Sequence, residues 1–348
     1  MVALPQLIIA GCIINFRFYS PRIISSMVEE LAKELGGELV QTHTSWVILL
    51  KDVVYKIKKP VNFGFLDYST LEKRRDNCEK EVVLNRRLCP WVYMGVVPIS
   101  ERDGRWVIED GTRVVEYAVK MRRIPDGRIL SNRLDDVSKD EIRRVADRVA
   151  RFHLSADRVD EFGKPEVMKF NTDENFQQTE EFVGITITRE DYEFIRDRTN
   201  RFYEVYEGLF YKRMKEGRIR DGHGDIRLEH VAFLEEGVCI FDCIEFNDRF
   251  RYGDVLNDMC FLSMELDFFG REGLSRVYEE EYLRITEDPE FDVFLHFFKC
   301  YRAYVRGKVT SFLLRDPHVP EEEKERAKEK ASRLFRLARR YAESIKLT

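Results

Sequence analysis

The chain has 348 residues, of which 44% are hydrophobic, and it includes 25 Phe and 15 Tyr. This length and apolar content suit two lobes or two domains with a substantial core, and they exclude an intrinsically disordered polymer. Charged residues make up 35% of the chain with both signs interspersed, and the net charge is only −5. That balance argues against a nucleic-acid coat protein, although it is compatible with a local basic patch.

Neither the N-terminal segment nor the cysteines indicate a membrane or export context. Residues 2–18 are apolar, but they include proline and amide residues, lack a basic leading region and fall short of the ~18–20 apolar residues that span a bilayer. We therefore predict a terminal strand or arm there. The seven cysteines include no Cys-x-x-Cys pair, and the nearest two, Cys239 and Cys243, have no His or Cys partner at zinc-site spacing. We predict small buried thiols in a soluble protein of the reducing cytoplasm.

The first part of the chain has strand patterns and one helix pattern. Alternating apolar residues and turn signals predict strands at 38–43, 45–50, 53–58, 106–110 and 113–121. Residues 69–72 have the chemistry of a capping box, and they begin a helix that we expect to end near Leu88.

Beyond residue 127 the pattern changes to helices. Apolar repeats predict helices at roughly 138–155, 188–215, 255–268, 273–285, 290–314 and 321–345. The fold class is therefore predicted as α+β. We expect an N-terminal arm or helix (1–37), a strand-rich N-lobe with one main helix (38–123) and a mostly helical C-lobe (124–348). The apolar spacing of the last helix predicts packing onto the C-lobe in preference to a dimer contact.

Two charged side chains of the N-lobe are candidates for fixing the phosphates of a nucleotide. Alternation places Val54, Lys56 and Lys58 on one face of their strand. Lys56 is the better candidate, because the small apolar Val54 stands two positions earlier and would cover a base. Helical spacing puts Glu81 on the inward stripe of the next helix, so we predict that it fixes Lys56. For either lysine alone, a solvated strand position is the simpler interpretation.

Two carboxylates stand at loop ends in the C-lobe. Asp225 follows Gly224, which allows an unusual local turn, and Asp242 ends the apolar run 238–241. Phosphoryl transfer needs one carboxylate to accept the proton of the attacking hydroxyl and another to hold the Mg²⁺ that bridges the phosphates. We predict these roles for Asp225 and Asp242. His223 is predicted to hold the loop by hydrogen bonds in preference to carrying a proton.

With these residues, the chain resembles the aminoglycoside phosphotransferase-like branch of the protein-kinase-like superfamily. The motif at 223–225 is similar to that family's catalytic loop, and 240–242 is similar to its metal-binding motif. Asp254 and Asp258 resemble the acids that open its next helix, and the second of these normally braces the catalytic loop. The resemblance extends to an uncharacterised bacterial and archaeal subgroup through the segments 42–47, 55–75, 119–123 and 301–309. It covers most of residues 38–315 and implies a bilobal protein-kinase-like fold.

The chain departs from the family pattern in three ways. The family's second metal ligand is an Asn five residues after the catalytic Asp, where this chain has His230. That change would shift the metal preference, bind the metal through water, or leave the second site weak. The segment 41–46 has no glycine, so Thr44, Ser45 and backbone amides would replace a glycine-rich phosphate flap. Many subgroup members are fused to a P-loop domain, and no G-x-x-x-x-G-K-[ST] sequence occurs here.

The resemblance also implies where two substrates would bind. The strand ending at Met121 would lead into the interlobe hinge, whose backbone would pair with adenine. The segment 170–182 and the helix with Arg302 and Arg306 would lie near the acceptor. These arginines, four residues apart on one helix face, would either bind an anionic acceptor or pair with acids of the C-lobe, and the sequence favours neither.

The leading hypothesis is a phosphotransferase that uses ATP and Mg²⁺ (or Mn²⁺) to phosphorylate a hydroxyl of a small-molecule acceptor. The predicted site residues are Asp225 as catalytic, Lys56, Glu81, Ser45 and Met121 as nucleotide-binding, and Asp242 and His230 as metal-binding. A membrane partner is not expected, and nucleic acid is neither indicated nor excluded. The alternatives are a catalytically weak nucleotide-binding regulator, motivated by His230 and the missing glycine loop, and a kinase for RNA or protein.

Overall fold

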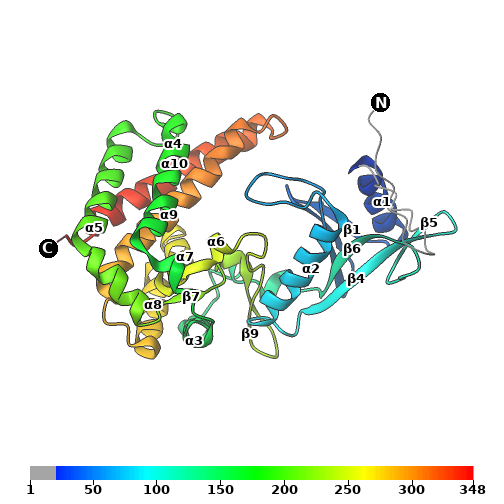
Figure 1. Ribbon diagram of the computed structural model, residues 1–348, viewed down its shortest axis with the longest axis horizontal. Helices are drawn as coiled ribbons and strands as arrows, with labels where there is room; N and C mark the ends of the chain where they lie inside the picture. Colours follow the sequence, from blue (N-terminus) through cyan, green and yellow to red (C-terminus); the bar gives the residue numbers. More distant parts are fainter. Residues whose placement is uncertain (1–20, 348) are drawn as a thin grey trace, which may run out of the picture.

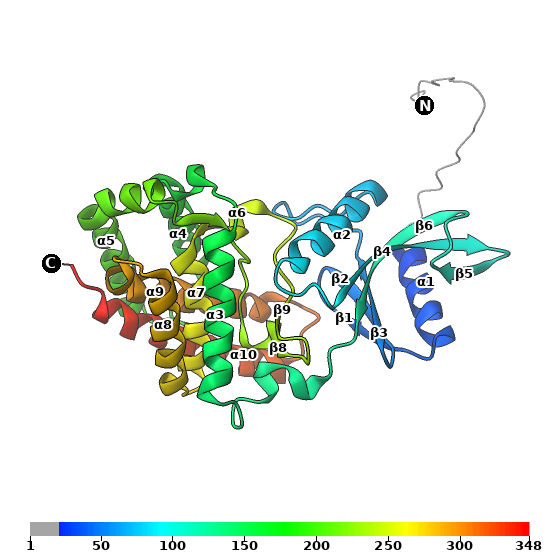
Figure 2. The same cartoon turned by 90° about the horizontal axis from the view of Figure 1, so that it is seen from below.

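Six antiparallel strands form the sheet of the N-lobe, in the order β1-β2-β3-β6-β4-β5. The computed structural model describes residues 21–347, and this sheet lies at the end of the molecule opposite to the C-terminus (Figures 1 and 2). The strands are β1 (Glu38–Gln41), β2 (Ser45–Leu49), β3 (Val53–Lys58), β4 (Tyr93–Arg102), β5 (Arg105–Ile108) and β6 (Val114–Arg122). The five strands predicted from the sequence are all present, which confirms the strand-rich N-lobe.

A helix precedes the sheet of the N-lobe and packs against it. The buried residues of α1 (Pro21–Glu34) include Ile24, Met27, Val28 and Leu31, at the i, i+3, i+4, i+7 spacing of an amphipathic helix. They pack in one cluster with Trp46 and Ile57 of the sheet. This helix lies within residues 1–37, where an N-terminal arm or helix is predicted, and α2 is the one main helix found between residues 38 and 123. The arm predicted over residues 2–18 lies outside the described residues.

The predicted helix, α2 (Leu71–Arg86), covers the other face of the sheet. Its N-terminus is capped by Thr70, whose side chain accepts a hydrogen bond from a backbone N–H of the first turn. Strand alternation directs Ile57 of β3 toward α1, whereas Lys56 and Lys58 point to the α2 side and reach one carboxylate there. The charged face of β3 is thus the face that meets α2 and the C-lobe.

Strand β4 is not predicted by its sequence, because Gly95 and Pro98 interrupt the pattern. In the structure it pairs with β6 along its length, and a register shift between Tyr93 and Gly95 accommodates the glycine. Pro98 has no N–H to donate, but its carbonyl accepts from the backbone N–H of Glu109 at 2.8 Å. Pairing with neighbouring strands therefore outweighs the unfavourable local sequence.

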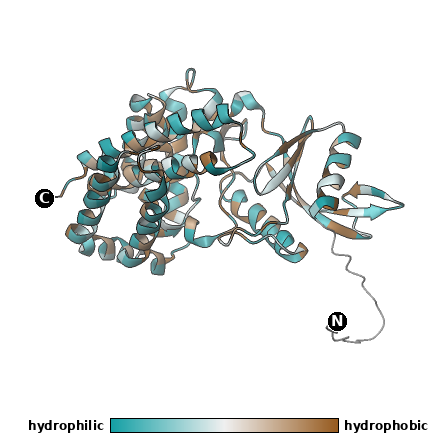
Figure 3. Cartoon of the chain, turned by 90° about the horizontal axis from the view of Figure 1, so that it is seen from above, coloured by the Kyte–Doolittle hydropathy of each residue, from teal (hydrophilic) through white to brown (hydrophobic). Residues whose placement is uncertain are grey.

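Helices make up most of the C-lobe (Figure 2), and along them hydrophobic and hydrophilic residues alternate (Figure 3). The main helices are α3 (Lys139–Ser155), α4 (Pro165–Thr179), α5 (Arg189–Lys215), α7 (Val255–Phe268), α8 (Glu272–Thr286), α9 (Phe291–Phe312) and α10 (Glu321–Ser344), with the short α6 (Asp248–Arg251). Two antiparallel ribbons complete the lobe, β7 (Ile219–Asp221) with β10 (Tyr252–Asp254) and β8 (Val231–Phe233) with β9 (Val238–Ile240). All the predicted helices are present; α4, which is rich in amide and acidic residues, is additional. The last helix buries Ala331, Leu334 and Ala338 in the C-lobe core, as predicted.

The two lobes are joined by a disulfide between Cys89, just after α2, and Cys239 on β9. This corrects the expectation that the cysteines are all thiols. Within residues 21–347 the other cysteines are buried free thiols, namely Cys78, Cys243, Cys260 and Cys300. The two bonded residues are 150 positions apart, so no spacing rule could have paired them. None of the described helices is long and apolar enough to cross a membrane.

Arg213 of α5 is buried between two carboxylates of the C-lobe. Its Nε lies 2.6 Å from Asp254 and its Nη1 lies 2.7 Å from Asp288, and the three side chains are at most 1% exposed. Replacing Arg213 by Met is expected to lower the free energy of unfolding by about 3–5 kcal/mol, because both carboxylates would stay buried without a counter-charge. Urea unfolding followed by circular dichroism measures this loss. The control Arg284→Ala removes a 67% exposed partner of Glu281 and should change little; equal losses in the two variants would contradict the prediction.

Candidate active site

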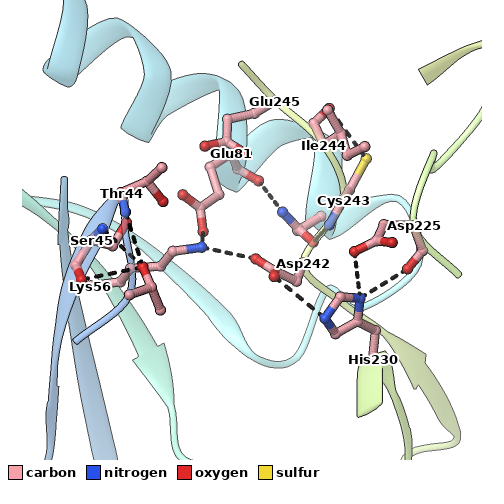
Figure 4. A network of polar contacts seen from close by, with 12 residues as sticks. Thr44, Ser45, Lys56, Glu81, Asp225, His230, Asp242, Cys243, Ile244 and Glu245 are labelled. Carbon is pink, nitrogen blue, oxygen red and sulfur yellow. Dashed lines mark hydrogen bonds and ion pairs between the residues drawn. The ribbon is translucent and has the colours of Figure 1, made fainter. Parts of the chain in front are cut away.

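Lys56 of β3 lies between one carboxylate of the N-lobe and one of the C-lobe (Figure 4). Its Nζ is 2.9 Å from Glu81 Oε1 and 2.8 Å from Asp242 Oδ1. Burial by itself would lower the pKa of Lys56, but the charges of Asp242 and Glu81 outweigh it and raise the pKa well above the usual value. The lysine is therefore a fixed cation at the meeting point of the lobes.

Lys58 lies deeper and has a different set of partners. Its Nζ is 2.7 Å from Glu81 Oε2, and it also binds Glu245 and the hydroxyl of Tyr68. The Lys58 side chain is 1% exposed, whereas that of Lys56 is 19% exposed. Lys58 thus fixes Glu81 from behind, and Lys56 is the lysine that faces open space.

Asp242 has a backbone conformation that few non-glycine residues adopt. Its φ is +61°, in the left-handed region where Asn and Asp are tolerated best. Two side chains of the N-lobe hold this loop: the Asp242 N–H donates to the Tyr93 hydroxyl (3.2 Å), and the Cys243 N–H donates to Asn85 Oδ1 (2.9 Å). The carboxylate is 43% exposed, and although desolvation raises its pKa, the charge of Lys56 holds the pKa well below the usual value. Asp242 therefore combines a strained backbone with an ionised and accessible carboxylate.

The loop with Asp225 is held by one buried acid of α7. Asp258 accepts hydrogen bonds from the backbone N–H groups of His223 (2.7 Å) and Gly224 (2.9 Å), so it braces the loop as the resemblance implies. Gly224 is required here, because its φ is +85° and a Cβ would lie 2.8 Å from the carbonyl oxygen of Phe250. The Asp225 N–H lies 3.3 Å from His223 Nδ1 and donates to it. Burial lowers the pKa of His223 to about 4, so the ring is neutral and holds the loop.

His230 lies between the two carboxylates that the sequence singles out. Its Nδ1 is 2.9 Å from the carbonyl oxygen of Asp225, which can only accept, so Nδ1 carries a proton. Its Nε2 is 3.3 Å from Arg227 Nη2 and 3.5 Å from Asp242 Oδ2. In this geometry Arg227 faces the nitrogen that a metal would need. Metal binding by His230 therefore stays a prediction, and it would require Arg227 to move.

The segment expected to replace the phosphate flap is a tight turn. Thr42 Oγ1 accepts from the backbone N–H groups of Thr44 (3.3 Å) and Ser45 (3.0 Å). The turn therefore already uses two of its backbone amides, and phosphate binding by this segment stays a prediction. Thr44 and Ser45 do line the space in front of Lys56, so their hydroxyls remain candidates.

Met121 lies in the middle of the sheet, opposite Val54 on one side and Tyr93 on the other. The next two residues, Arg122 and Arg123, donate their N–H groups to other strands and turns. Backbone pairing with adenine stays a prediction. The hinge that would make this pairing is the stretch of chain just after β6.

A cavity of about 880 Å³ extends from Lys56 into the C-lobe. Its walls include Thr44, Ser45, Lys56, Asp225 and Asp242, but not Glu81, Met121 or His230. Helices α4 and α9 form the wall of its far end. These helices include most of the segment 170–182 and both Arg302 and Arg306. This volume suits a nucleotide together with a small second ligand.

Arg227 is a site residue that the sequence analysis does not single out. Its Nε lies 2.8 Å from Asp225 Oδ1 and its Nη2 lies 2.5 Å from Glu229 Oε1. A basic residue two positions after a candidate catalytic acid is the only signal that could have indicated it. Arg227 orients Asp225 from behind, because it contacts this carboxylate without lining the cavity itself.

The structure therefore brings Lys56, Glu81, Asp225, His230 and Asp242 together. Lys56 and Lys58 face the three carboxylates of Glu81, Asp242 and Glu245, so this group has one negative charge more than it has lysine charges. That excess suits a bound cation. No cluster of three or more His, Cys, Asp or Glu side chains with metal-binding geometry occurs within residues 21–347.

No protein-family model matches the chain. Three curated proteins described as uncharacterized, from Mycobacterium bovis and two strains of Mycobacterium tuberculosis, are each 31% identical to it over 274 residues. The match covers 77% of this chain and 53% of each relative, so the chain spans about half the length of the curated relatives it matches.

Solved structures with a similar fold include three small-molecule kinases. A choline kinase from Cryptosporidium parvum Iowa II superposes with a TM-score of 0.53 at 12% identity, over 88% of each chain. A microcompartment-associated aminopropanol kinase has a TM-score of 0.52 at 15% identity, over 93% of this chain and 100% of its own. An amicoumacin kinase in complex with AMP-PNP, Ca²⁺ and Ami has a TM-score of 0.54 at 11% identity, over 93% and 94%. At these identities the likeness concerns the fold.

Proposed function

Because this chain has the bilobal, protein-kinase-like fold of the aminoglycoside phosphotransferases and choline kinases, we propose that it transfers the γ-phosphate of ATP to a hydroxyl of a small molecule. The observation that carries the proposal is Lys56, fixed by Glu81 and paired with Asp242, on the wall of the cavity that Asp225 also lines. This is the set of groups that phosphoryl transfer requires. The kinase neighbours support the same reaction class.

Each residue has a role that follows from its contacts. Lys56 neutralises the phosphates of ATP, and Glu81, held from behind by Lys58, keeps its ammonium in place. Asp225 accepts the proton of the acceptor hydroxyl as the new bond to phosphorus forms. Arg227 contacts the carboxylate of Asp225 and His230 contacts its backbone carbonyl oxygen, and together they orient it. The hydroxyls of Thr44 and Ser45 bind the phosphates from the opposite wall.

Asp242 fits a divalent metal ion. One of its oxygens contacts Lys56, while the other has only His230, at 3.5 Å, as a partner among residues 21–347, so it is free to bind a cation. Mg²⁺ in phosphoryl-transfer sites is usually held by one or two carboxylates together with phosphates and water, which agrees with the lack of an all-protein cluster in the described part of the chain. When bound, the metal supplies neutralisation of the phosphate charge.

The proposal is tested by removing the lysine charge. Replacing Lys56 by Met is expected to lower kcat/KM for ATP by about 10²–10³-fold, because the phosphates would lose a fixed cation that is oriented before they bind. The measurement is transfer of ³²P from γ-labelled ATP, or ADP release, with Mg²⁺ or Mn²⁺. The control Lys59→Met changes a lysine three positions later, whose ammonium contacts Gln41 and Trp46 outside the cavity, and should keep the activity. Equal activity of Lys56→Met and the wild type would remove the main support for the proposal.

A catalytically weak nucleotide-binding regulator is the second candidate. It is favoured by His230, which occupies the place of the expected metal-binding Asn and already contacts Asp225. ATP binding that does not depend on metal, without turnover on any hydroxyl compound or water, would identify the regulator. Metal-dependent turnover would identify the enzyme.

A further inference from the structure

The far end of the cavity has three basic side chains on α9, and they are poorly matched by acids. Arg302, Arg306 and Lys308 line this end together with Tyr301. Arg306 has its nearest carboxylate, Glu265, at 3.8 Å, and neither Arg302 nor Lys308 has an ion-pair partner among residues 21–347. The sequence leaves open whether these cations pair with C-lobe acids; the structure shows that most of their charge is not matched.

Lys308 is the most unusual of the three. It is 8% exposed, and its Nζ donates to Asn175 Oδ1 and Gln178 Oε1 of α4, each at 2.6 Å. Both partners are neutral amides, so they satisfy hydrogen bonds without supplying a counter-charge. Burial lowers the pKa of Lys308 to about 8, and the opposing charge of Glu174 does not outweigh it.

The two amides also have donors to offer. Since an ammonium can only donate, Asn175 and Gln178 must turn their carbonyl oxygens toward Lys308, which leaves their NH₂ groups to donate elsewhere. The third N–H of the ammonium has no hydrogen-bond acceptor among residues 21–347, although the Phe312 ring centroid lies 5.7 Å from Nζ. The ammonium of Lys308 and the NH₂ groups of Asn175 and Gln178 thus provide N–H donors around one positive charge. Such a group of donors suits an oxyanion.

The acids near this end of the cavity are already paired. Glu174 of α4 binds Arg249, and Asp225 binds Arg227. Neither is therefore free to bind a cationic acceptor, and the charge of Glu174 offsets the burial of Lys308 only in part. A cationic acceptor would meet a surplus of positive charge here, whereas an anionic one would restore the balance.

Arg302 connects this end of the cavity to the reaction centre. Its Nη1 lies 3.5 Å from the carbonyl oxygen of Gly224, next to Asp225. Lys308 follows Arg302 by six positions, which corresponds to a rise of about 9 Å along α9. A small molecule of that length would place a hydroxyl at Asp225 and its other end at Lys308.

We propose that Lys308, with the amides of Asn175 and Gln178, binds an oxyanionic group, a carboxylate or a phosphate ester, of the hydroxyl-bearing acceptor. This inference rests on the proposed phosphotransferase function for the identity of the ligand as the acceptor. The anion site itself depends only on the contacts of α4 and α9. Lys308 is then a residue that determines specificity.

The test is isothermal titration calorimetry of the full chain, with AMP-PNP and Mg²⁺ bound first, at constant ionic strength. Four probes share a six-carbon polyol skeleton: gluconate, glucose 6-phosphate, glucose and glucosamine. We expect gluconate, glucose 6-phosphate or both to bind about 10–100-fold more tightly than glucose and glucosamine, as a charge-assisted contact provides. Gluconate binding alone indicates a carboxylate site, and glucose 6-phosphate binding alone indicates a phosphate site.

Three variants separate an anion site from a structural bridge between α4 and α9. Lys308→Met should lose the preference for the anion, whereas Lys308→Arg should keep it even if the methionine variant folds poorly. The control Lys169→Met removes a lysine of α4 that pairs with Asp173 and does not line the cavity; it should bind like the wild type.

Equal affinity for the four probes, including no measurable binding of either anion, overturns the proposal. So does unchanged anion binding by a folded Lys308→Met variant. The AMP-PNP titration is read separately: if the nucleotide does not bind, the phosphotransferase proposal fails. Comparison of the wild type with Lys308→Met without nucleotide then still decides on the anion site.

Discussion

Replacing Asp225 by Asn is expected to lower turnover by about 10²–10⁴-fold while nucleotide binding stays nearly unchanged. The amide keeps the shape of the carboxylate and can still accept a hydrogen bond from Arg227, but it cannot take the proton of the acceptor hydroxyl. The backbone of the loop is held by Asp258 through other atoms, so the fold should not change. Turnover is measured as ADP release with Mg²⁺ and ATP, and binding is measured by titration with AMP-PNP.

The matched control for this variant is Glu229→Gln. Glu229 pairs with the same Arg227, but its side chain is 54% exposed and does not line the cavity. The same loss of charge beside the same guanidinium should therefore leave turnover close to that of the wild type. Wild-type turnover in Asp225→Asn would rule out Asp225 as the base, and an equal loss in both variants would point to Arg227 instead.

Replacing Asp242 by Asn is expected to abolish the metal dependence of ATP binding and to lower turnover by about 10³-fold or more. The lost metal contact supplies several kcal/mol of charge stabilisation, and each 1.4 kcal/mol corresponds to about tenfold in rate. Asn is the appropriate replacement, because it tolerates the left-handed backbone at φ +61° that Asp242 adopts. The measurement is the affinity for ATP with Mg²⁺ and with a chelator, together with turnover at saturating ATP.

Asp248→Asn provides the control for Asp242→Asn. The two aspartates have side chains that are both 43% exposed, but Asp248 pairs with Lys80 and Arg251 and does not line the cavity. In the wild type and in the control, Mg²⁺ should tighten ATP binding, and in Asp242→Asn it should not. If Mg²⁺ still tightens ATP binding to Asp242→Asn, the metal ligand lies elsewhere.

Local periodicity predicted much of the N-lobe site. Strand alternation places Lys56 and Lys58 on one face, and helical spacing places Glu81 on the inward stripe of α2; the structure brings Lys56 and Glu81 to 2.9 Å. Both patterns are short-range, because a side chain's direction depends on the dihedral angles of its own element. For the same reason the helices predicted from apolar spacing are found in the structure. Strand β4 was not predicted, because its Gly95 and Pro98 disfavour a strand, and pairing with neighbouring strands stabilises it.

What the sequence alone determined, therefore, is the α+β architecture, the direction of Lys56 and Glu81, and the two acidic loop ends. Only the tertiary structure decided which groups meet across the chain. It paired Cys89 with Cys239, placed Lys58 behind Glu81, set Arg227 against both Asp225 and His230, and left Lys308 buried without a carboxylate. The reason is that burial and counter-charge belong to contacts between distant segments, and no local pattern specifies whether a buried cation will find an acid.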